Sequence, residues 1–145
     1  MFFKELSAAD LETIAKEIQW VRERWIRIPN VAPYAFDGGD DDLIALGYVE
    51  YEGLEQYFKN ERQTGYRKFA LVFGNILVHQ LGFEWVWGIE NNTRLLLRHP
   101  ARKELIDPIR LARVESEKAT WRCPDFSSLY ARIEGGLKHG IPISA

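Results

Sequence analysis

Sulfur and histidine are scarce in this sequence, which has one cysteine, one methionine and three histidines among 145 residues. The single cysteine, Cys123, cannot form a disulfide within the chain, and it suits a reducing compartment. The histidines are scattered, with no pair at the spacing of metal ligands. Because a zinc site needs four converging ligands, we expect no metal site, and we expect the protein to be cytoplasmic.

Long apolar runs and an excess of positive charge are also absent. The most apolar stretch, residues 68–86, is interrupted by Asn75, His79 and Gln80, whereas a membrane-spanning helix needs about 20 apolar residues. The first residues lack the charged and apolar segments of a signal peptide. A net charge of −2 provides no basic face for nucleic acid. We therefore expect no binding to membranes or to nucleic acid.

Catalytic and cofactor-binding motifs are missing as well. Gly38 and Gly39 lack the lysine and the serine or threonine of a phosphate-binding loop, and no nucleophile elbow, kinase or dinucleotide signature occurs. Cys123 precedes Pro124 near an expected helix start, a place that can activate a thiol. No partner base can be identified for it, and free cysteines usually behave as small buried hydrophobes. We assign no catalytic residue and no cofactor.

Aromatic residues are abundant instead. Five tryptophans, six tyrosines and eight phenylalanines make up 13% of the chain. The hydrophobic share of 46% and the charged share of 28% are those of a globular protein, and 145 residues suit a single domain. This composition indicates either a strongly aromatic core or an aromatic surface used for binding.

The first part of the chain shows helical periodicity. Ser7 and Asp10 form a helix-start signal, after which apolar residues recur every three or four positions. This pattern predicts a helix over residues 8–28, ended by Pro29 because a residue before proline disfavours helical geometry.

Two more helices are expected before the pattern changes from helical to strand-forming at residue 83. One covers residues 42–62, and a turn follows at residues 61–65. The central helix covers residues 66–81 and ends at Gly82, which can adopt a left-handed cap. His79 lies in this helix, and its expected role is that of a hydrogen-bonded core or boundary residue.

Residues 83–99 predict a β-hairpin, because segments rich in strand-forming residues flank Asn91 and Asn92, which suit a two-residue turn. That turn divides the hairpin into an aliphatic face, expected to pack on helices, and a mixed face. The mixed face would consist of Trp85, Trp87, Ile89, Arg94, Leu96 and Arg98. A three-residue turn would shift the register and remove this division.

The last part of the chain completes an α+β domain over residues 1–145. Partial alternation of apolar and polar residues predicts further strands in residues 104–114, with a short helix as the alternative. A final helix is expected over residues 125–134, ended by Gly135 and Gly136. The predicted architecture has N-terminal helices packed on a small antiparallel sheet, closed by this C-terminal helix.

Two groups of residues are candidates for binding a partner. The first is the mixed face of the hairpin, since interfaces favour tryptophan and arginine, and it comprises Trp85, Trp87, Arg94 and Arg98. The second is an acidic loop, whose members are Asp37, Asp40, Asp41 and Asp42. Alternatively, a helix covers the tryptophans and the loop acids only cap a helix and contact solvent. The loop lacks the ligand spacing of an EF-hand, so we do not interpret it as a calcium site.

A resemblance appears in the C-terminal half. The helix-to-strand segment from Leu81 to Val86, the Ile106-Asp107-Pro108 segment and the late stretch from Pro124 to Gly135 resemble a pattern in bacterial α+β families of unknown function. Similar small α+β proteins act as immunity proteins of bacterial toxin systems. The resemblance implies a role of that kind, with a toxin domain as partner.

These observations lead to two functional hypotheses. The first is a non-catalytic protein-binding module, such as an immunity protein that covers a toxin's active site, where an acidic loop would steer a basic toxin. The second is a small enzyme or small-molecule-binding domain with a pocket between the sheet and the helices. A pocket that contains His79 or carboxylates would favour the second hypothesis.

Overall fold

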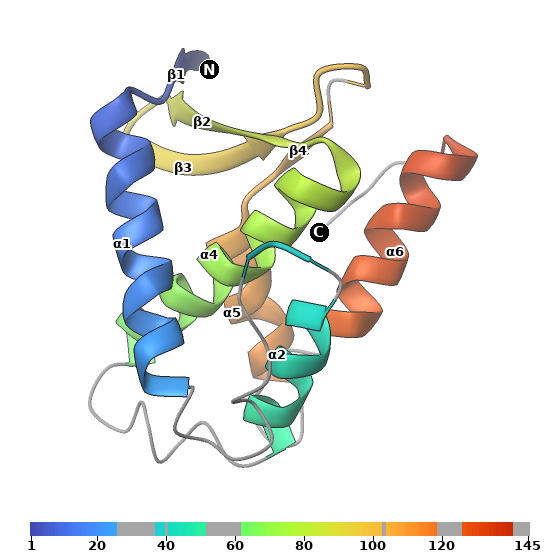
Figure 1. Cartoon of the computed structure of the whole chain (residues 1–145). Helices are drawn as coiled ribbons and strands as arrows, with labels where there is room; N and C mark the ends of the chain where they lie inside the picture. Colours follow the sequence, from blue (N-terminus) through green and yellow to red (C-terminus); the bar gives the residue numbers. More distant parts are fainter. Residues whose placement is uncertain (26–36, 40, 52–61, 103, 119–125, 141–145) are drawn as a thin grey trace.

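The fold was analysed in a computed structural model, which describes residues 1–25, 37–39, 41–51, 62–102, 104–118 and 126–140 (Figure 1). The elements in chain order are β1 (Phe2–Glu5), α1 (Ala8–Trp25), α2 (Asp41–Tyr51), α4 (Arg62–Leu81), β2 (Glu84–Ile89), β3 (Thr93–Arg98), β4 (Leu105–Ile106), α5 (Pro108–Lys118) and α6 (Phe126–His139).

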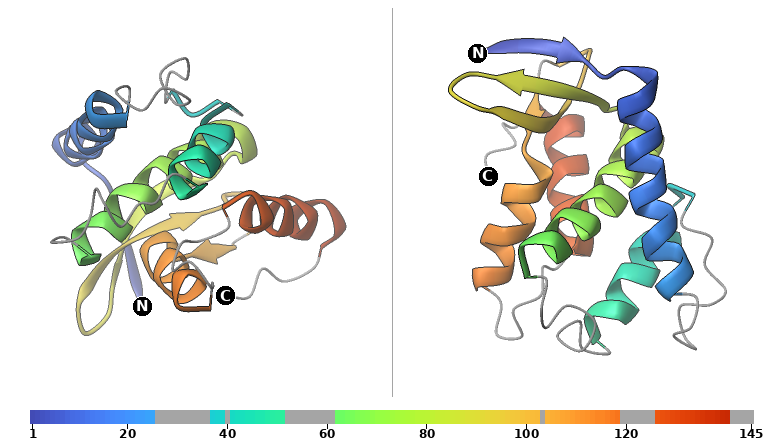
Figure 2. Two further views of the ribbon diagram at one scale, coloured as in Figure 1. Left: turned by 90° about the horizontal axis from the view of Figure 1, so that it is seen from below. Right: turned by 90° about the vertical axis from the view of Figure 1, so that its left-hand side faces the viewer.

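The architecture is α+β, as expected. The strands form one antiparallel sheet in the order β1-β2-β3-β4. The helices lie on one side of this sheet, so that the molecule has a sheet layer above a helix layer (Figures 1 and 2). The main core lies between the two layers, and we call the opposite side of the sheet the outer face.

The start of α1 confirms the capping signal. The Ser7 amide donates to Oδ2 of Asp10 over 2.9 Å, and the Asp10 amide donates to the Ser7 hydroxyl over 3.1 Å. This reciprocal arrangement satisfies two amides that a helix start otherwise leaves without partners. The predicted helix is described as far as Trp25, and residues 26–28 lie outside the described ranges.

The central helix also forms, with corrected bounds. It begins at Arg62, so the predicted turn at residues 61–65 is wrong from that position onward. Gly65 costs the helix about 1 kcal/mol, which is less than burying one large apolar side chain contributes. The helix ends where Gly82 takes a φ of 78°, as expected. Its fully buried side chains include Phe73, Leu71, Ile76 and Leu77.

The helix expected at residues 42–62 is present in its first part. It is α2, which begins one residue earlier, at Asp41, and is described to Tyr51. Residues 52–61 lie outside the described ranges.

The predicted hairpin register is wrong by one residue. Trp85 pairs with Leu97, Trp87 with Leu95 and Ile89 with Thr93, so three residues, 90–92, connect the strands. Because side chains alternate along a strand, this shift moves the whole of β3 to the opposite face relative to β2. The tryptophans therefore share the inner face with leucines, and the arginines lie on the outer face.

The inner tryptophans hold the helix layer to the sheet. Trp85 is 9% exposed and belongs to the core. A Cβ atom added to Gly74 of α4 would lie 2.3 Å from Cη2 of Trp85, so the helix approaches the indole where it has no side chain. Trp87 donates from Nε1 to Oδ2 of Asp10 over 3.0 Å, which joins β2 to the start of α1.

The segment predicted as strands at residues 104–114 is mainly a helix. Only Leu105 and Ile106 pair as β4, and α5 then begins at Pro108. Asp107 caps this helix, since its Oδ1 accepts the Arg110 amide over 3.0 Å. Proline suits the first helical position because a backbone N–H there, which proline lacks, has no hydrogen-bond acceptor within the helix.

The last helix is longer than predicted. It runs through Gly135 and Gly136 to His139, and Gly140 then takes a φ of 68°. Gly136 is buried, and the Arg102 guanidinium donates to the carbonyls of Gly136 and Leu137. Packing of the helix therefore outweighs the local preference of two glycines to end it.

The strand β1 was not expected from the sequence. Four residues are too few to show a period, and the strand forms by pairing with β2, more than 80 positions along the chain. It occupies one edge of the sheet, with Phe3 and Glu5 opposite Gly88 and Val86 on the outer face.

The contact between Gly74 and Trp85 gives a first prediction. Gly74→Ala should destabilise the protein by about 1–3 kcal/mol, the usual cost of overpacking a core. Gly47→Ala in α2 is the matched control, because an added Cβ there meets nothing within 4 Å, and it should stabilise by about 0.5–1 kcal/mol. Urea unfolding measures both, and equal effects of the two substitutions would contradict the proposed packing.

The cap of α1 gives a second prediction. The hydrogen bond from Trp87, and after it those from Ser7, hold the pKa of Asp10 below its usual 3.8. A lowered carboxyl pKa contributes stability that is present above 3.8 and is lost as the pH falls through the folded-state pKa.

Asp10→Asn should therefore be less stable than the native protein near neutral pH, and the difference should shrink as the pH falls below 3.8, through the lowered pKa of Asp10. Urea midpoints measured across this range test it, with Glu12→Gln on the same helix as the control for net charge. A difference that is independent of pH would show that the hydrogen bonds do not depend on the ionised carboxylate.

Candidate functional site

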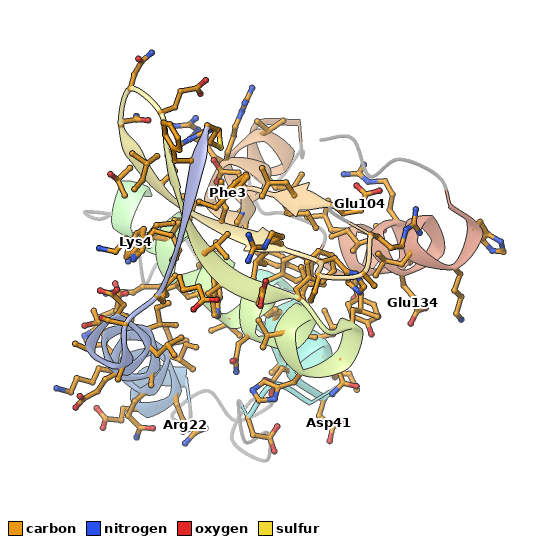
Figure 3. All side chains as sticks on the ribbon, turned by 90° about the horizontal axis from the view of Figure 1, so that it is seen from above. Phe3, Lys4, Arg22, Asp41, Glu104 and Glu134 are labelled. Carbon is orange, nitrogen blue, oxygen red and sulfur yellow. The ribbon has the colours of Figure 1, made fainter. Side chains whose placement is uncertain are left out.

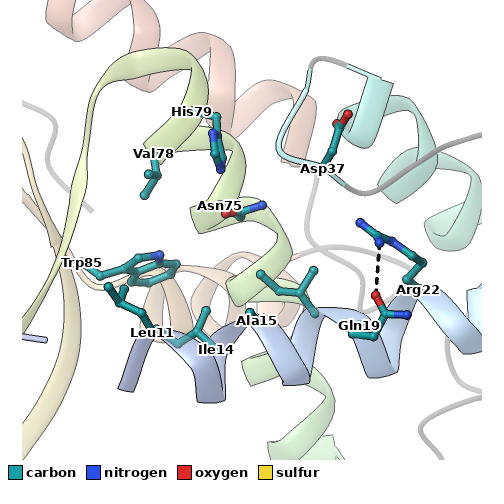
Figure 4. Close-up of a pocket in the computed structure, with 11 residues that line it drawn as sticks. Leu11, Ile14, Ala15, Gln19, Arg22, Asp37, Asn75, Val78, His79 and Trp85 are labelled. Carbon is teal, nitrogen blue, oxygen red and sulfur yellow. Dashed lines mark hydrogen bonds between the residues drawn. The ribbon is translucent and has the colours of Figure 1, made fainter. Parts of the chain in front are cut away.

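A groove of about 440 Å³ runs between α1 and α4 and is closed at one end by Trp85 of β2 (Figure 4). One wall is a single side of α1, from Leu11 to Arg22, which spans about 16 Å at the helical rise per residue. The other wall is the C-terminal half of α4. The groove is therefore elongated along α1.

The groove exists because α1 is fastened along its other side. Glu17 accepts two hydrogen bonds from the Arg67 guanidinium of α4, over 3.0 and 3.2 Å. Beside this pair, the Lys68 ammonium lies 3.9 Å from the centre of the Trp20 ring. These contacts hold the two helices together on one flank, and the opposite flank of α1 remains open.

One end of the groove is apolar. Leu11 is 48% exposed although it is a large hydrophobic residue, and it faces Trp85 in Figure 4. Ile14 and Ile18 form the buried floor, and Val78 contributes from α4. An apolar floor that solvent can reach is typical of a binding site.

The other end and the rim are polar. Gln19 accepts a hydrogen bond from Arg22 over 3.1 Å, and Asp37 lies across the groove from them (Figure 4). Asn75 and His79 follow one another by one turn of α4 and project from the same side of it. The groove thus combines an aromatic end with amide, imidazole and charged groups.

The loop before α2 carries Asp37 and is held in place by α4. Gly38 has a φ of 89°, its amide donates to the buried Asp42 over 2.8 Å, and its carbonyl accepts from Gln80 over 3.1 Å. A Cβ atom added at Gly38 would lie 2.3 Å from Cδ2 of His79. The loop at Gly38 and the imidazole ring of His79 therefore restrict each other's position.

The groove contains an imidazole and a carboxylate, from His79 and Asp37, and we expected such a pocket to favour a small enzyme or small-molecule-binding domain. None of its lining residues is a serine, threonine, cysteine or tyrosine that could act as a nucleophile. In the described ranges, no group of three or more histidine, cysteine, aspartate and glutamate side chains could hold a metal ion. No helix of those ranges is long and apolar enough to cross a bilayer.

Two of the predicted partner-binding residues, Trp85 and Asp37, meet in the groove. Trp85 comes there from the inner face of the hairpin, where α4 covers it, as in the alternative that a helix covers the tryptophans. Trp87 is half-buried against Asp10.

The other predicted residues lie elsewhere. Arg94 binds Asp107 over 3.3 Å and Arg98 binds Glu84 over 2.8 Å. Asp41 is exposed in the first turn of α2 and Asp42 is buried behind the loop. Asp40 lies outside the described residues.

The sequence analysis did not select Leu11, Arg22 or Asn75 as binding residues. A signal for Asn75 and His79 was available, since two polar residues one turn apart interrupt an otherwise apolar helix. The expected core or boundary role of His79 is corrected, because its side chain is exposed at the groove.

No protein-family model matches this chain, and no curated protein matches it. A crystal structure of a protein from Bacteroides thetaiotaomicron VPI-5482 is similar, with a TM-score of 0.70 and 18% sequence identity. The similarity covers 92% of this chain and 47% of the other. This chain thus spans about half the length of its structural neighbour, and the likeness concerns the fold.

The loop contact gives a third prediction. Gly38→Ala should lower the free energy of unfolding by about 1–3 kcal/mol, because alanine is strained at the positive φ of this position. It should also displace the His79 ring. Gly140→Ala is the matched control, since Gly140 has a φ of 68° with nothing within 4 Å of an added Cβ. Both substitutions should lower stability in urea, but only the first should shift the imidazole resonances of His79. Unshifted resonances in Gly38→Ala would contradict the coupling.

Proposed function

We propose that this chain is a non-catalytic protein-binding module that holds a short amphipathic helix of its partner in the groove between α1 and α4. The observation that carries the proposal is the open flank of α1 from Leu11 to Arg22, which is apolar as far as Ile18. A hydrophobic groove between two helices is a common receptor for a third helix.

The dimensions of the groove support a helical ligand. Its length of about 16 Å corresponds to about three helical turns. A ligand helix of that length presents apolar residues at i, i+3 or i+4, and i+7 along one side. Side chains at this spacing would follow the floor formed by Ile14 and Ile18 towards Trp85.

The polar and apolar residues of the groove indicate which parts of it would contact the apolar and polar sides of a ligand helix. Trp85 and the exposed Leu11 offer the apolar anchor site, and partly buried tryptophans are frequent energetic centres of interfaces. Asn75 and His79 lie on the rim, where they can hydrogen-bond the polar side of a helix. Tight binding is therefore expected from the aromatic end and selectivity from the rim.

A small molecule is the second candidate for the groove. The volume of about 440 Å³ falls within the range of roughly 300–1,000 Å³ typical of small-molecule sites. Such a ligand would place an apolar group against Trp85 and polar groups near Asn75 and His79. The extended shape of the groove favours the peptide helix.

Two finer parts of the proposal rest on the sequence. The protein is proposed to be cytoplasmic, which the single cysteine supports because it suits a reducing compartment. The resemblance to bacterial α+β families of unknown function, which are similar to immunity proteins, supports the proposal of a toxin domain as the partner. The exposed Asp37 and Asp41 would then contact a basic surface. The groove proposal holds for any partner that carries a suitable helix.

The test is a display selection of helix-forming peptides against this chain, followed by affinity measurements on two variants. Ala15→Trp fills the middle of the groove and should weaken binding of the selected peptides at least about tenfold, equivalent to about 1.4 kcal/mol. Lys16→Trp introduces the same side chain at a position that is 77% exposed on α1 and does not line the groove. It should leave the affinity unchanged.

Circular dichroism and urea unfolding must first show that both variants fold. Equal affinity for the two variants would place the peptide site elsewhere and reject the proposal. Selected peptides without apolar residues at helical spacing would reject the helical ligand.

A further inference from the structure

A second surface, independent of the groove, lies at the open edge of the sheet. We propose that β1 pairs antiparallel with the β1 of a second copy of this chain, with Phe3 opposite its own counterpart. The pairing would join two four-stranded sheets into one continuous sheet with two-fold symmetry. Figure 3 looks onto the outer face of the sheet, with β1 in front and Phe3 and Lys4 labelled.

The edge of β1 is open, and its first half is apolar. β1 hydrogen-bonds to β2 alone, and the described residues contain no strand beyond it. Edge strands are normally protected by charges, proline, a bulge or a covering segment, because their unpaired backbone groups attract other strands. In β1 the charges are confined to the second half, at Lys4 and Glu5. Met1, Phe2 and Phe3 before them are 47%, 81% and 45% exposed. Three consecutive exposed hydrophobic residues on an open edge indicate an interaction surface.

The alternation of side chains restricts how two copies can pair. Phe3 and Glu5 lie on the outer face, and Phe2 and Lys4 lie on the helix side. In a continuous antiparallel sheet, residues directly opposite one another lie on the same face. A two-fold pairing of β1 must therefore be centred on one of its four residues rather than between two residues. A centre at Glu5 would place two carboxylates opposite each other, which leaves Phe2, Phe3 and Lys4.

Only the pairing centred on Phe3 is complementary. A centre at Lys4 would place two ammonium groups opposite each other, which is destabilising. A centre at Phe2 would pair only Phe2, of the four residues of β1, with the β1 of the other copy. The centre at Phe3 pairs Phe2, Phe3 and Lys4 with the β1 of the other copy and places Glu5 opposite Met1. It brings each Phe2 ring beside the Lys4 ammonium of the other copy.

The outer face positions Phe3 for this contact. The Arg98 guanidinium lies 5.7 Å from the centre of the Phe3 ring and is bound to Glu84 over 2.8 Å. Gly88, opposite Phe3, lacks a side chain, and a Cβ there would meet Leu96 at 2.4 Å and Met1 at 3.2 Å. The ring is thus flanked by a fixed cation, and two such rings would meet on the two-fold axis as an aromatic pair.

The expected dimer is weak. Pairing of one four-residue strand buries far less than the roughly 1,600 Å² of a standard interface. Association should therefore depend on concentration in the micromolar to millimolar range.

Cysteine cross-linking tests the register. In a Cys123→Ser background, Phe3→Cys places two thiols opposite each other, about 4.5–5.5 Å apart between Cα atoms, within the reach of a disulfide. Glu5→Cys is the matched control on the same face, because its two copies would be about 13 Å apart at the strand rise per residue. Under mild oxidation, Phe3→Cys should form a disulfide-linked dimer and Glu5→Cys should not.

Sedimentation velocity tests the association itself, from about 10 μM to about 1 mM, the range expected for a sub-standard interface. Phe3→Glu would place two carboxylates opposite each other and should raise the dimer dissociation constant at least about tenfold. Leu105→Glu, at the other edge of the sheet, is the control and should leave the constant unchanged. A monomer throughout this range, or equal cross-linking of the two cysteine variants, would overturn the proposal.

Discussion

The close approach of α4 to Trp85 is the contact on which the rest of the structure depends. Gly74 lets the helix backbone lie against the indole and against Leu97, where an added Cβ atom would lie 2.3 and 3.3 Å from their side chains. This contact sets the distance between the helix layer and the sheet. It also fixes the orientation of the ring that forms the aromatic end of the groove.

The attachment of α1 explains why a groove remains beside this contact. Asp10 joins the start of the helix to Trp87 of β2, and Glu17 joins its middle to Arg67 of α4. Both bonds lie away from the open flank of α1. The apolar residues on that flank, such as Leu11, are therefore exposed although their spacing resembles that of a core helix. A partner that covers the flank would complete the burial.

The two proposed surfaces are consecutive in the chain but separate in space. β1 ends at Glu5 and α1 begins at Ala8, so the open edge of the sheet leads directly into the wall of the groove. The edge lies in the sheet layer and the groove opens between helices below it (Figures 1 and 4). A second copy at β1 would extend the sheet sideways, which leaves the groove available to a partner.

Local signals in the sequence were sufficient for the α+β class, the cap at Ser7, the central helix with its stop at Gly82, and the existence of the hairpin. These features depend on neighbouring residues. The register of the hairpin depended on tertiary packing, because loops of two and three residues fit the same flanking strands and differ in which face meets the helices. Strand β1 and the groove likewise needed the folded chain, since their contacts join residues far apart in sequence.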